Sequence, residues 1–307
     1  MPPATHSTSA AAPIVPSRSR PRSATSALRD YWQLVRPRIV GLVLFTMVIA
    51  AIVSPAEAFS WLTLLHGVIG STLVIIGAIA LNASLEQSSD AKMMRTAKRP
   101  VPAGRLPRRQ VIWFGAVTSA LGFVYLAAWV NGWIVGLALL SWVIYVWVYT
   151  PLKMLTAWQT PIGAIAGAMP VLLGSAAAGE PLNATALALF GTVYFWQFPH
   201  SMAIAWLYRH DFAAADLRVA TVADPSGRSA ARLAVFGAAA LIPVSLVPVF
   251  VGAVGWAYGG VAIMLGLAYL LPSLGFWVCR DDASARTLLR VSFAYVPVVF
   301  LTILLAA

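Results

Sequence analysis

The sequence predicts an all-α polytopic membrane protein with nine transmembrane helices, its N-terminus in the cytoplasm and its C-terminus outside. The first observation behind this prediction is composition: 60% of the 307 residues are hydrophobic and only 10% are charged. That balance is too apolar for a soluble protein of this length. The second is a series of uncharged runs long enough to span a bilayer, and the third is the placement of the basic residues between them.

The uncharged runs give the number of spans. They cover residues 39–56, 58–85, 110–152, 154–179, 181–208, 233–278 and 291–307. A span needs about 20 apolar residues, with about 17 as the lower limit, so the runs 110–152 and 233–278 each hold two spans. The first divides at Asn131-Gly132 and the second near Gly252 to Gly255. The prediction is therefore nine membrane-spanning helices.

The basic residues test this count. With a cytoplasmic N-terminus, all 21 Lys and Arg fall in the inner segments, which are the N-terminal tail, 87–109, 151–160, 207–232 and 279–290. The outer loops keep only two acids, Glu57 and Glu180. This is the distribution that the positive-inside rule describes. Topology therefore explains the net charge of +11, and no nucleic-acid partner is expected.

The ends of the domain follow from composition. Residues 1–29 contain no acid and are rich in Ser, Ala, Pro and Arg, which predicts a disordered basic tail before a single membrane domain over 30–307. A mitochondrial transit peptide has a similar composition, but the prolines in this segment disfavour an amphipathic helix. The single Cys279 excludes an intrachain disulfide and a CxxCH haem attachment.

The first polar cluster follows directly on the second predicted span. A helix that reaches residue 90 places Asn82, Glu86 and Asp90 at i, i+4 and i+8 on one face. Their oxygens can converge on Mg²⁺, which is usually held by one or two carboxylates together with substrate phosphates. The positive charge that suits a diphosphate comes from Lys92, Arg95, Lys98, Arg99 and Arg105.

The alternative interpretation of this cluster is a solvated helix end followed by a basic loop that orients the protein in the membrane. One detail argues against it. Anions in the last turn of a helix oppose the helix macrodipole, so Glu86 and Asp90 are unfavourably placed unless a cation compensates them.

A second polar cluster lies on the same predicted side of the membrane, after the sixth span. It contains His200, Arg209, His210, Asp211, Asp216 and Arg218. Ionisable groups at this depth are candidates for function. Asp211 and Asp216 are five positions apart, about 140° around a regular helix, so both can bind one cation only if the segment bends. Asp211 is the stronger candidate, and Asp216 has a solvated loop role as its alternative.

Two further basic residues stand near the predicted site. Tyr149 and Lys153 share a helical face at i, i+4, unless Pro151 ends the helix and moves Lys153. Lys153 can serve as an interfacial anchor that extends to the membrane surface, or it can reach a diphosphate oxygen. Arg36, at the mouth of the first span, has the same two possible roles.

These segments together carry a family resemblance. LVRPRIVGLVLFT, NxxxExxxD followed by KMMRTAKRPVPAGR, YTPLKMLT, and WQFPH followed by RHDF occur in the order found in the UbiA-type intramembrane prenyltransferases. Within that superfamily the chain resembles most the protoheme IX farnesyltransferases, or haem O synthases, from about Asp30 to the C-terminus. The resemblance implies nine helices around a central cavity, with two acidic motifs that hold Mg²⁺ and an isoprenoid diphosphate.

The chain also departs from the family pattern. Glu86 stands where many bacterial relatives have Asp, which keeps the carboxylate but lengthens its reach. The second motif of the superfamily is often DxxxD, and residue 215 of this chain is Ala. Residues 216–222 read DLRVATV, where many members of the haem branch read GIPMLPV. Of the two acids, Asp211 therefore matches the family's second acidic motif better than Asp216 does.

The resemblance implies transfer of a farnesyl group from farnesyl diphosphate to the vinyl group of haem b, with Mg²⁺ as cofactor. The implied metal ligands are Asn82, Glu86, Asp90, Asp211 and Asp216, and the other catalytic residues are Tyr149 and Lys153. Substrate binding is expected from Arg36, Arg95, Lys98, Arg99, Arg105, Arg209 and His200. The expected setting is the lipid of a bacterial inner membrane, or less readily the mitochondrial one, with a downstream haem A synthase as partner.

Some roles have two interpretations. His200 can ligate haem iron, because imidazole is a common axial ligand, or it can be a hydrogen-bonded histidine inside the bundle. Aromatic rings can present π faces to an allylic cation or serve packing and membrane anchoring; they are Tyr145, Tyr149, Trp196 and Trp206.

Two other functions remain possible at this point. The chain can prenylate a quinone precursor or chlorophyllide, because a metal site alone does not select the acceptor. It can also be a transporter or a haem-handling assembly factor. A transporter predicts paired repeats with broken helices in corresponding positions, and the sequence shows no such duplication.

Overall fold

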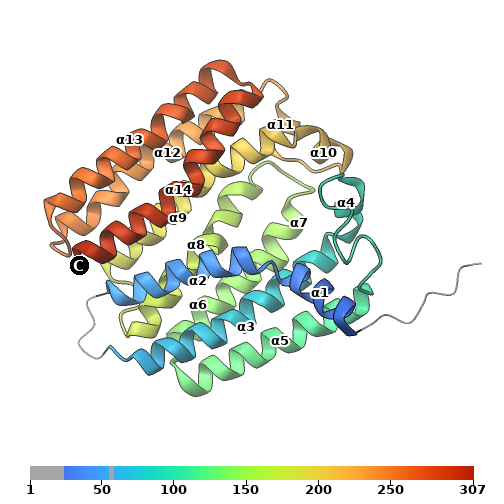
Figure 1. Ribbon diagram of the computed structural model, residues 1–307, viewed down its shortest axis with the longest axis horizontal. Helices are drawn as coiled ribbons and strands as arrows, with labels where there is room; N and C mark the ends of the chain where they lie inside the picture. Colours follow the sequence, from blue (N-terminus) through green and yellow to red (C-terminus); the bar gives the residue numbers. More distant parts are fainter. Residues whose placement is uncertain (1–23, 55–58) are drawn as a thin grey trace, which may run out of the picture.

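The described chain is a bundle of long helices that run side by side (Figure 1). The structure is a computed structural model that describes residues 24–54 and 59–307. No strand occurs within these ranges. The predicted all-α class is confirmed.

The long helices correspond to the uncharged runs of the sequence. They are α2 (Pro37–Ile52), α3 (Trp61–Leu85), α5 (Arg108–Trp129), α6 (Gly132–Val143), α8 (Gln159–Ala178), α9 (Ala184–Leu207), α12 (Arg228–Phe250), α13 (Trp256–Cys279) and α14 (Asp282–Ala306). Shorter elements connect them or cover one end. These are α1 (Ala24–Val35), α4 (Gln87–Lys92), the π-helix η1 (Ile144–Tyr149), α7 (Thr150–Leu152), α10 (Arg209–Ala214) and α11 (Ala220–Ala223).

Seven helices of the described chain are long and apolar enough to cross a membrane, and α6, η1 and α7 form one of them, Gly132–Leu152. The pair α1 and α2, bent by 47°, would make an eighth if it forms one span. The 24-residue α9 is not among the seven. The chain therefore has the helices of a multi-pass membrane protein, whereas nine spans and the orientation of the termini stay predictions.

The N-terminal boundary differs from the prediction. Helix α1 begins at Ala24, so residues 24–29 of the predicted disordered tail are helical. Their sequence, ATSALR, contains residues with good helix propensity, which the overall composition of the tail obscured. The rest of the tail and Glu57 lie outside the described residues.

Glycines let α3 and α5 approach closely. A Cβ at Gly77 would lie 2.6 Å from the carbonyl oxygen of Gly115, and a Cβ at Gly115 would lie 2.9 Å from that of Gly77. Small residues at helix crossings are typical of membrane bundles, where close van der Waals packing drives association. This packing fixes α3, and the first acidic cluster begins at its C-terminal end.

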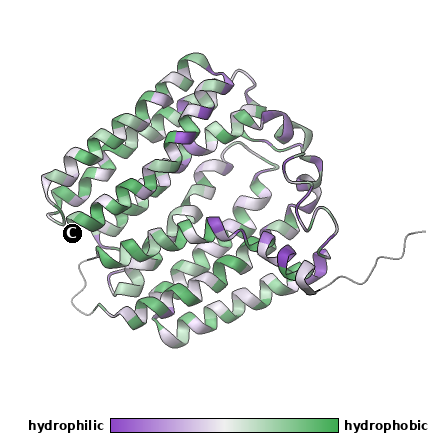
Figure 2. Cartoon of the chain, viewed as in Figure 1, coloured by the Kyte–Doolittle hydropathy of each residue, from purple (hydrophilic) through white to green (hydrophobic). Residues whose placement is uncertain are grey.

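Hydrophilic residues gather at the end of the bundle that carries α1, α4 and α10 (Figure 2). An apolar cluster of Met93, Ala215, Leu217 and Val219 joins the segment after α4 to the segment after α10. The two polar clusters, predicted to lie on one side of the membrane, therefore lie at one end of the molecule.

Candidate functional site

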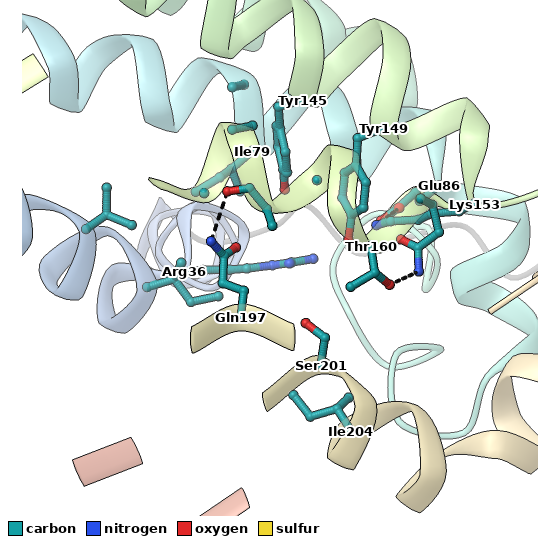
Figure 3. A pocket seen from close by; sticks show the side chains of 18 of the residues that line it. Arg36, Ile79, Glu86, Tyr145, Tyr149, Lys153, Thr160, Gln197, Ser201 and Ile204 are labelled. Atoms are coloured by element: carbon teal, nitrogen blue, oxygen red, sulfur yellow. Dashed lines mark hydrogen bonds and ion pairs between the residues drawn. The ribbon is translucent and has the colours of Figure 1, made fainter. Parts of the chain in front are cut away.

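A cavity of about 480 Å³ extends from the polar end into the bundle, between α2, α3, α6, η1, α8 and α9 (Figure 3). Polar side chains around it include Arg36, Glu86, Asp90, Arg95, Arg99, Tyr145, Tyr149, Lys153, Gln159, Thr160, Gln197, His200 and Ser201. Further along α3 the wall becomes apolar, with Ala78, Ile75 and Val74. The cavity can therefore hold a molecule with a charged head and a hydrophobic tail.

The first acidic cluster lies at a break between two helices. Helix α3 ends at Leu85 and α4 begins at Gln87, so the expected single helix through residue 90 was wrong. The helical hydrogen bonds continue across the break, since Glu86 N donates to Asn82 O at 2.9 Å and Asp90 N to Glu86 O at 2.8 Å. The three side chains therefore still follow one another on successive turns, as the spacing predicted.

The two carboxylates of this cluster line the cavity and form ion pairs with the protein's own cations. Lys153 Nζ lies 2.6 Å from Glu86 Oε1, and Arg99 Nη1 lies 2.8 Å from Asp90 Oδ2. Lys153 thus compensates Glu86, which caps the C-terminal end of α3 and would otherwise oppose its macrodipole. The expected conflict with a helix dipole does not apply to Asp90, which lies in the first turn of α4. Asn82 is buried, does not line the cavity, and donates its amide to Thr150 Oγ1 at 2.8 Å.

The ion pair of Glu86 and Lys153 keeps both side chains charged. Burial favours the neutral carboxyl, but the Lys153 ammonium and the Arg36 guanidinium outweigh burial and lower the pKa of Glu86. Burial likewise disfavours the ammonium, but the Glu86 carboxylate raises the pKa of Lys153. Burial and the nearby Arg36 lower the pKa of Arg99, against the effect of Asp90. Positive charge is therefore concentrated around the two carboxylates.

The π-helical turn η1 presents Tyr145 and Tyr149 to the cavity, and Lys153 follows directly after α7. A π-turn holds one more residue than an α-helical turn and often occurs at functional sites. The Tyr145 and Tyr149 rings stack with centroids 5.8 Å apart, and Lys153 Nζ lies 4.2 Å from the Tyr149 ring centroid. Pro151 does not separate Lys153 from Tyr149, because Lys153 N donates to Tyr149 O at 3.3 Å.

The alternative role of Lys153 as a surface anchor does not fit its position, because its side chain is only 19% exposed and is paired with Glu86. Arg36 also lines the cavity, as does Gln197 (Figure 3). Its backbone has φ 52° and ψ 61°, the left-handed region that side chains other than glycine rarely adopt. Such strain persists where the surrounding structure holds it and is common at functional sites.

The second acidic cluster lies beside the first but outside the cavity. Asp216 Oδ2 pairs with Lys92 Nζ at 2.6 Å, and Asp211 Oδ2 accepts a hydrogen bond from the Arg95 backbone N at 3.4 Å. Within residues 24–54 and 59–307, no three His, Cys, Asp or Glu side chains lie close enough to hold a metal together. The five predicted ligands therefore do not form one preformed cage. Asp216 is paired with Lys92, and Asp211 accepts a hydrogen bond from the Arg95 backbone N–H.

Comparison with known proteins fits this fold. The sequence model described as the UbiA prenyltransferase family matches residues 43–301. The chain belongs to this family. A protein of Solibacter usitatus named protoheme IX farnesyltransferase is 40% identical over 282 residues, which cover 89% of this chain and 97% of that protein. A protein of Salinibacter ruber with the same name is 37% identical over a region that covers 88% of this chain and 95% of that protein.

Solved structures show the same UbiA fold at low sequence identity. A digeranylgeranylglyceryl phosphate synthase structure superposes with a TM-score of 0.75 at 14% identity, covering 92% of this chain and 98% of that one. A UbiA homologue from Archaeoglobus fulgidus bound to GPP and Mg²⁺ gives a TM-score of 0.61 at 15% identity. The match covers 89% of this chain and 99% of that one.

The UbiA-family cavity does not include every basic residue that the sequence suggested. Lys98, Arg105 and Arg209 do not line it. Arg105 Nε pairs with Asp30 at 2.8 Å, and Arg209 Nη1 pairs with Asp282 at 2.9 Å. In these positions Arg105 joins the loop after α4 to α1, and Arg209 joins α10 to α14.

His200 lines the cavity and its ring is held in a defined orientation. It stacks on Trp196, with ring centroids 4.8 Å apart, and its Nδ1 shares a hydrogen bond of 2.8 Å with Ser292 Oγ. Ser292 Oγ donates its own proton to Leu289 O at 2.6 Å, so Nδ1 is the donor and Nε2 keeps its lone pair. Trp196 and Trp206, proposed from sequence as π faces, are buried and do not line the cavity.

Several polar residues of the UbiA-family site were missed in the sequence. Gln197 lies three positions before His200 on α9, so helical spacing from His200 would have indicated it, and Ser201 lies one turn after Gln197. Gln159 and Thr160 begin α8, where Gln159 Nε2 donates to Thr160 Oγ1 at 2.9 Å. No motif marks these two residues, because only the packing of α8 against η1 brings them to the cavity.

The donor set suits a hard divalent cation that is shared with a substrate. Glu86 and Asp90 offer carboxylate oxygens at the cavity wall, and Mg²⁺ commonly uses one or two carboxylates together with substrate phosphates. The residues therefore fit Mg²⁺ bound with a diphosphate, and they do not fit a cage made by the described protein alone.

Proposed function

We propose that the chain transfers a farnesyl group from farnesyl diphosphate to a vinyl group of haem b and so makes haem O. One observation carries the proposal: a single cavity has paired acids and bases at its polar end and apolar walls behind them. The names of relatives that match over most of their length support farnesyl as donor and haem as acceptor. In the overall reaction, the bond between farnesyl C1 and the diphosphate oxygen breaks, a carbon–carbon bond forms to the vinyl group, and water supplies the hydroxyl.

Charge stabilisation at the polar end drives the loss of diphosphate. Glu86 and Asp90 would hold Mg²⁺, which supplies positive charge to the departing diphosphate. Lys153 and Arg99, which pair with these carboxylates, can then donate to phosphate oxygens, and Arg36 and Arg95 line the same part of the cavity. Donors and cations fixed in advance around the developing charge are the largest source of rate enhancement in many enzymes.

The walls protect the carbocation that remains. Tyr145 and Tyr149 line the cavity next to the ion pairs, and their π faces can stabilise an allylic cation. Apolar residues of α3 and α6 enclose the rest of the farnesyl group. This exclusion of water keeps the cation from being quenched before the acceptor reacts.

His200 is the proposed iron ligand for the acceptor. Its Nε2 keeps a lone pair, since Nδ1 donates to Ser292, and the ring lines the same cavity as Glu86 and Asp90. A Soret titration of His200→Ala should show weaker haem binding than the wild type. An unchanged titration would remove His200 from this role.

The proposed setting is the bacterial inner membrane. With α9 as a further span, the described bundle accommodates the nine predicted spans, and both acidic clusters then face the cytoplasm. The product would pass to a haem A synthase, the proposed downstream partner.

The proposal is tested by incubating membranes that contain the protein with farnesyl diphosphate, Mg²⁺ and haem b. We expect a product with the mass of haem O that disappears when the metal is chelated. Absence of this product, together with prenylation of a quinone precursor or chlorophyllide offered in its place, would assign a different acceptor.

A further inference from the structure

The cavity has a closed far end. Four buried residues from three helices form this end wall, namely Ser71 and Val74 of α3, Ala138 of α6 and Leu173 of α8. One turn beyond Ser71 the helices touch. A Cβ at Gly67 would lie 3.1 Å from Ala177 Cβ and 3.4 Å from Met47 Cε, so the helices leave no free room for a further methyl group at this level.

The depth of the cavity can be estimated along α3. Ser71 and Glu86 are 15 positions apart, which is about 22 Å at 1.5 Å per residue. An extended chain of three isoprene units measures about 15 Å with carbon–carbon bonds of about 1.5 Å, and a diphosphate adds on the order of 5 Å. A farnesyl diphosphate whose diphosphate lies beside Glu86, the carboxylate nearer the end wall, therefore spans nearly this whole depth. A fourth isoprene unit, about 5 Å longer by the same bond lengths, would collide with the end wall.

We propose that the end wall selects the prenyl donor by length, accepting three isoprene units and excluding four. This inference rests on the proposed function, because it assumes that a prenyl diphosphate binds with its head at Glu86 and Asp90. Leu173 and Ala138 are the specificity-determining positions, because their side chains occupy the space that a longer chain needs.

The test is a competition between farnesyl and geranylgeranyl diphosphate with haem b as acceptor, with both products quantified by mass. Leu173→Ala deepens the cavity, and we expect it to raise the ratio of geranylgeranyl to farnesyl product about tenfold. Ala138→Leu shortens the cavity, and it should lower farnesyl transfer about tenfold while geranyl transfer from geranyl diphosphate persists.

Two further variants separate donor selection from damage to the fold. Leu126→Ala removes the same side chain from the same apolar cluster as Leu173, but Leu126 does not line the cavity, so the product ratio should stay at the wild-type value. Ser71→Ala removes a buried hydroxyl that has no hydrogen-bond partner among the described residues. It should fold normally and favour the longer donor severalfold.

The results distinguish the inference from the proposed function. If no variant and no wild-type sample transfers any prenyl group, the proposed function fails. If transfer occurs but all end-wall variants keep the wild-type product ratio, the end wall does not select the prenyl donor by its length. In that case the tail leaves the cavity sideways, past Ile39, which lines the cavity and is 51% exposed.

Discussion

The two acidic clusters lie side by side at one end of the bundle, yet they have different environments. Glu86 and Asp90 line the cavity, and each is paired with a cation. Asp211 and Asp216 lie outside the cavity, and the ion pair of Asp216 with Lys92 is largely exposed, with side chains 72% and 51% accessible. An acidic motif at a helix end therefore does not by itself define a reaction site, because enclosure decides how strongly its charges act.

The difference matters because charge interactions weaken in water. Exposed ion pairs are typically worth about 0–1 kcal/mol, whereas removing one partner of a buried pair costs about 3–5 kcal/mol because the other charge is left uncompensated. Substitutions in the two clusters should therefore differ strongly in effect. The predictions that follow run from the largest expected effect to the smallest.

Asp90→Asn and Glu86→Gln should have the largest effect. Each keeps the shape of the side chain but removes a charge that the proposed cation requires, so haem O formation should fall by about 10²- to 10³-fold. The measurement is product formation at saturating Mg²⁺ in membranes that contain equal amounts of protein. Glu180→Gln is the matched control, since Glu180 is an exposed acid on the loop between α8 and α9, and its activity should be unchanged.

Lys153→Met should have the next largest effect. It removes the partner of Glu86 and a proposed diphosphate donor, so kcat/KM for farnesyl diphosphate should fall about tenfold to a hundredfold. Lys92→Met is the matched control, because Lys92 forms an equally short ion pair but lies outside the cavity. Equal losses in the two variants would mean that enclosure does not distinguish the clusters.

Asp211→Asn should have an intermediate effect. Among the residues that the structure describes, the Asp211 carboxylate accepts one hydrogen bond, from the Arg95 backbone N at 3.4 Å, so it can turn toward a cation that is bound with the substrate. We expect about a tenfold loss of activity and a higher Mg²⁺ concentration at half-maximal rate. A Mg²⁺ dependence identical to that of the wild type would assign metal binding to the first cluster alone.

Asp216→Asn should have the smallest effect. Its pair with Lys92 is exposed, and breaking such a pair changes little, so activity and melting temperature should stay within about twofold and about 2 °C of the wild-type values. A loss comparable to that of Asp90→Asn would show that the second cluster joins the reaction site when substrate binds.

The sequence alone determined the helical class and the positions of most helix boundaries. The division at Asn131-Gly132 is confirmed, since α5 ends at Trp129 and α6 begins at Gly132. The division near Gly252 to Gly255 is confirmed by the end of α12 at Phe250 and the start of α13 at Trp256. These features are readable because hydrophobic length and chain-breaking residues act locally. The shared face of Tyr149 and Lys153 is local in the same way.

Only the tertiary structure decided which charges meet. Glu86 and Lys153 are 67 positions apart, and Lys92 and Asp216 are 124 apart, so no local pattern could pair the first two inside the cavity and the second two outside it. The depth of the cavity likewise depends on how α3, α6 and α8 touch near Gly67. Helix formation depends on neighbours along the chain, whereas burial, ion pairing and cavity shape depend on residues that only packing brings together.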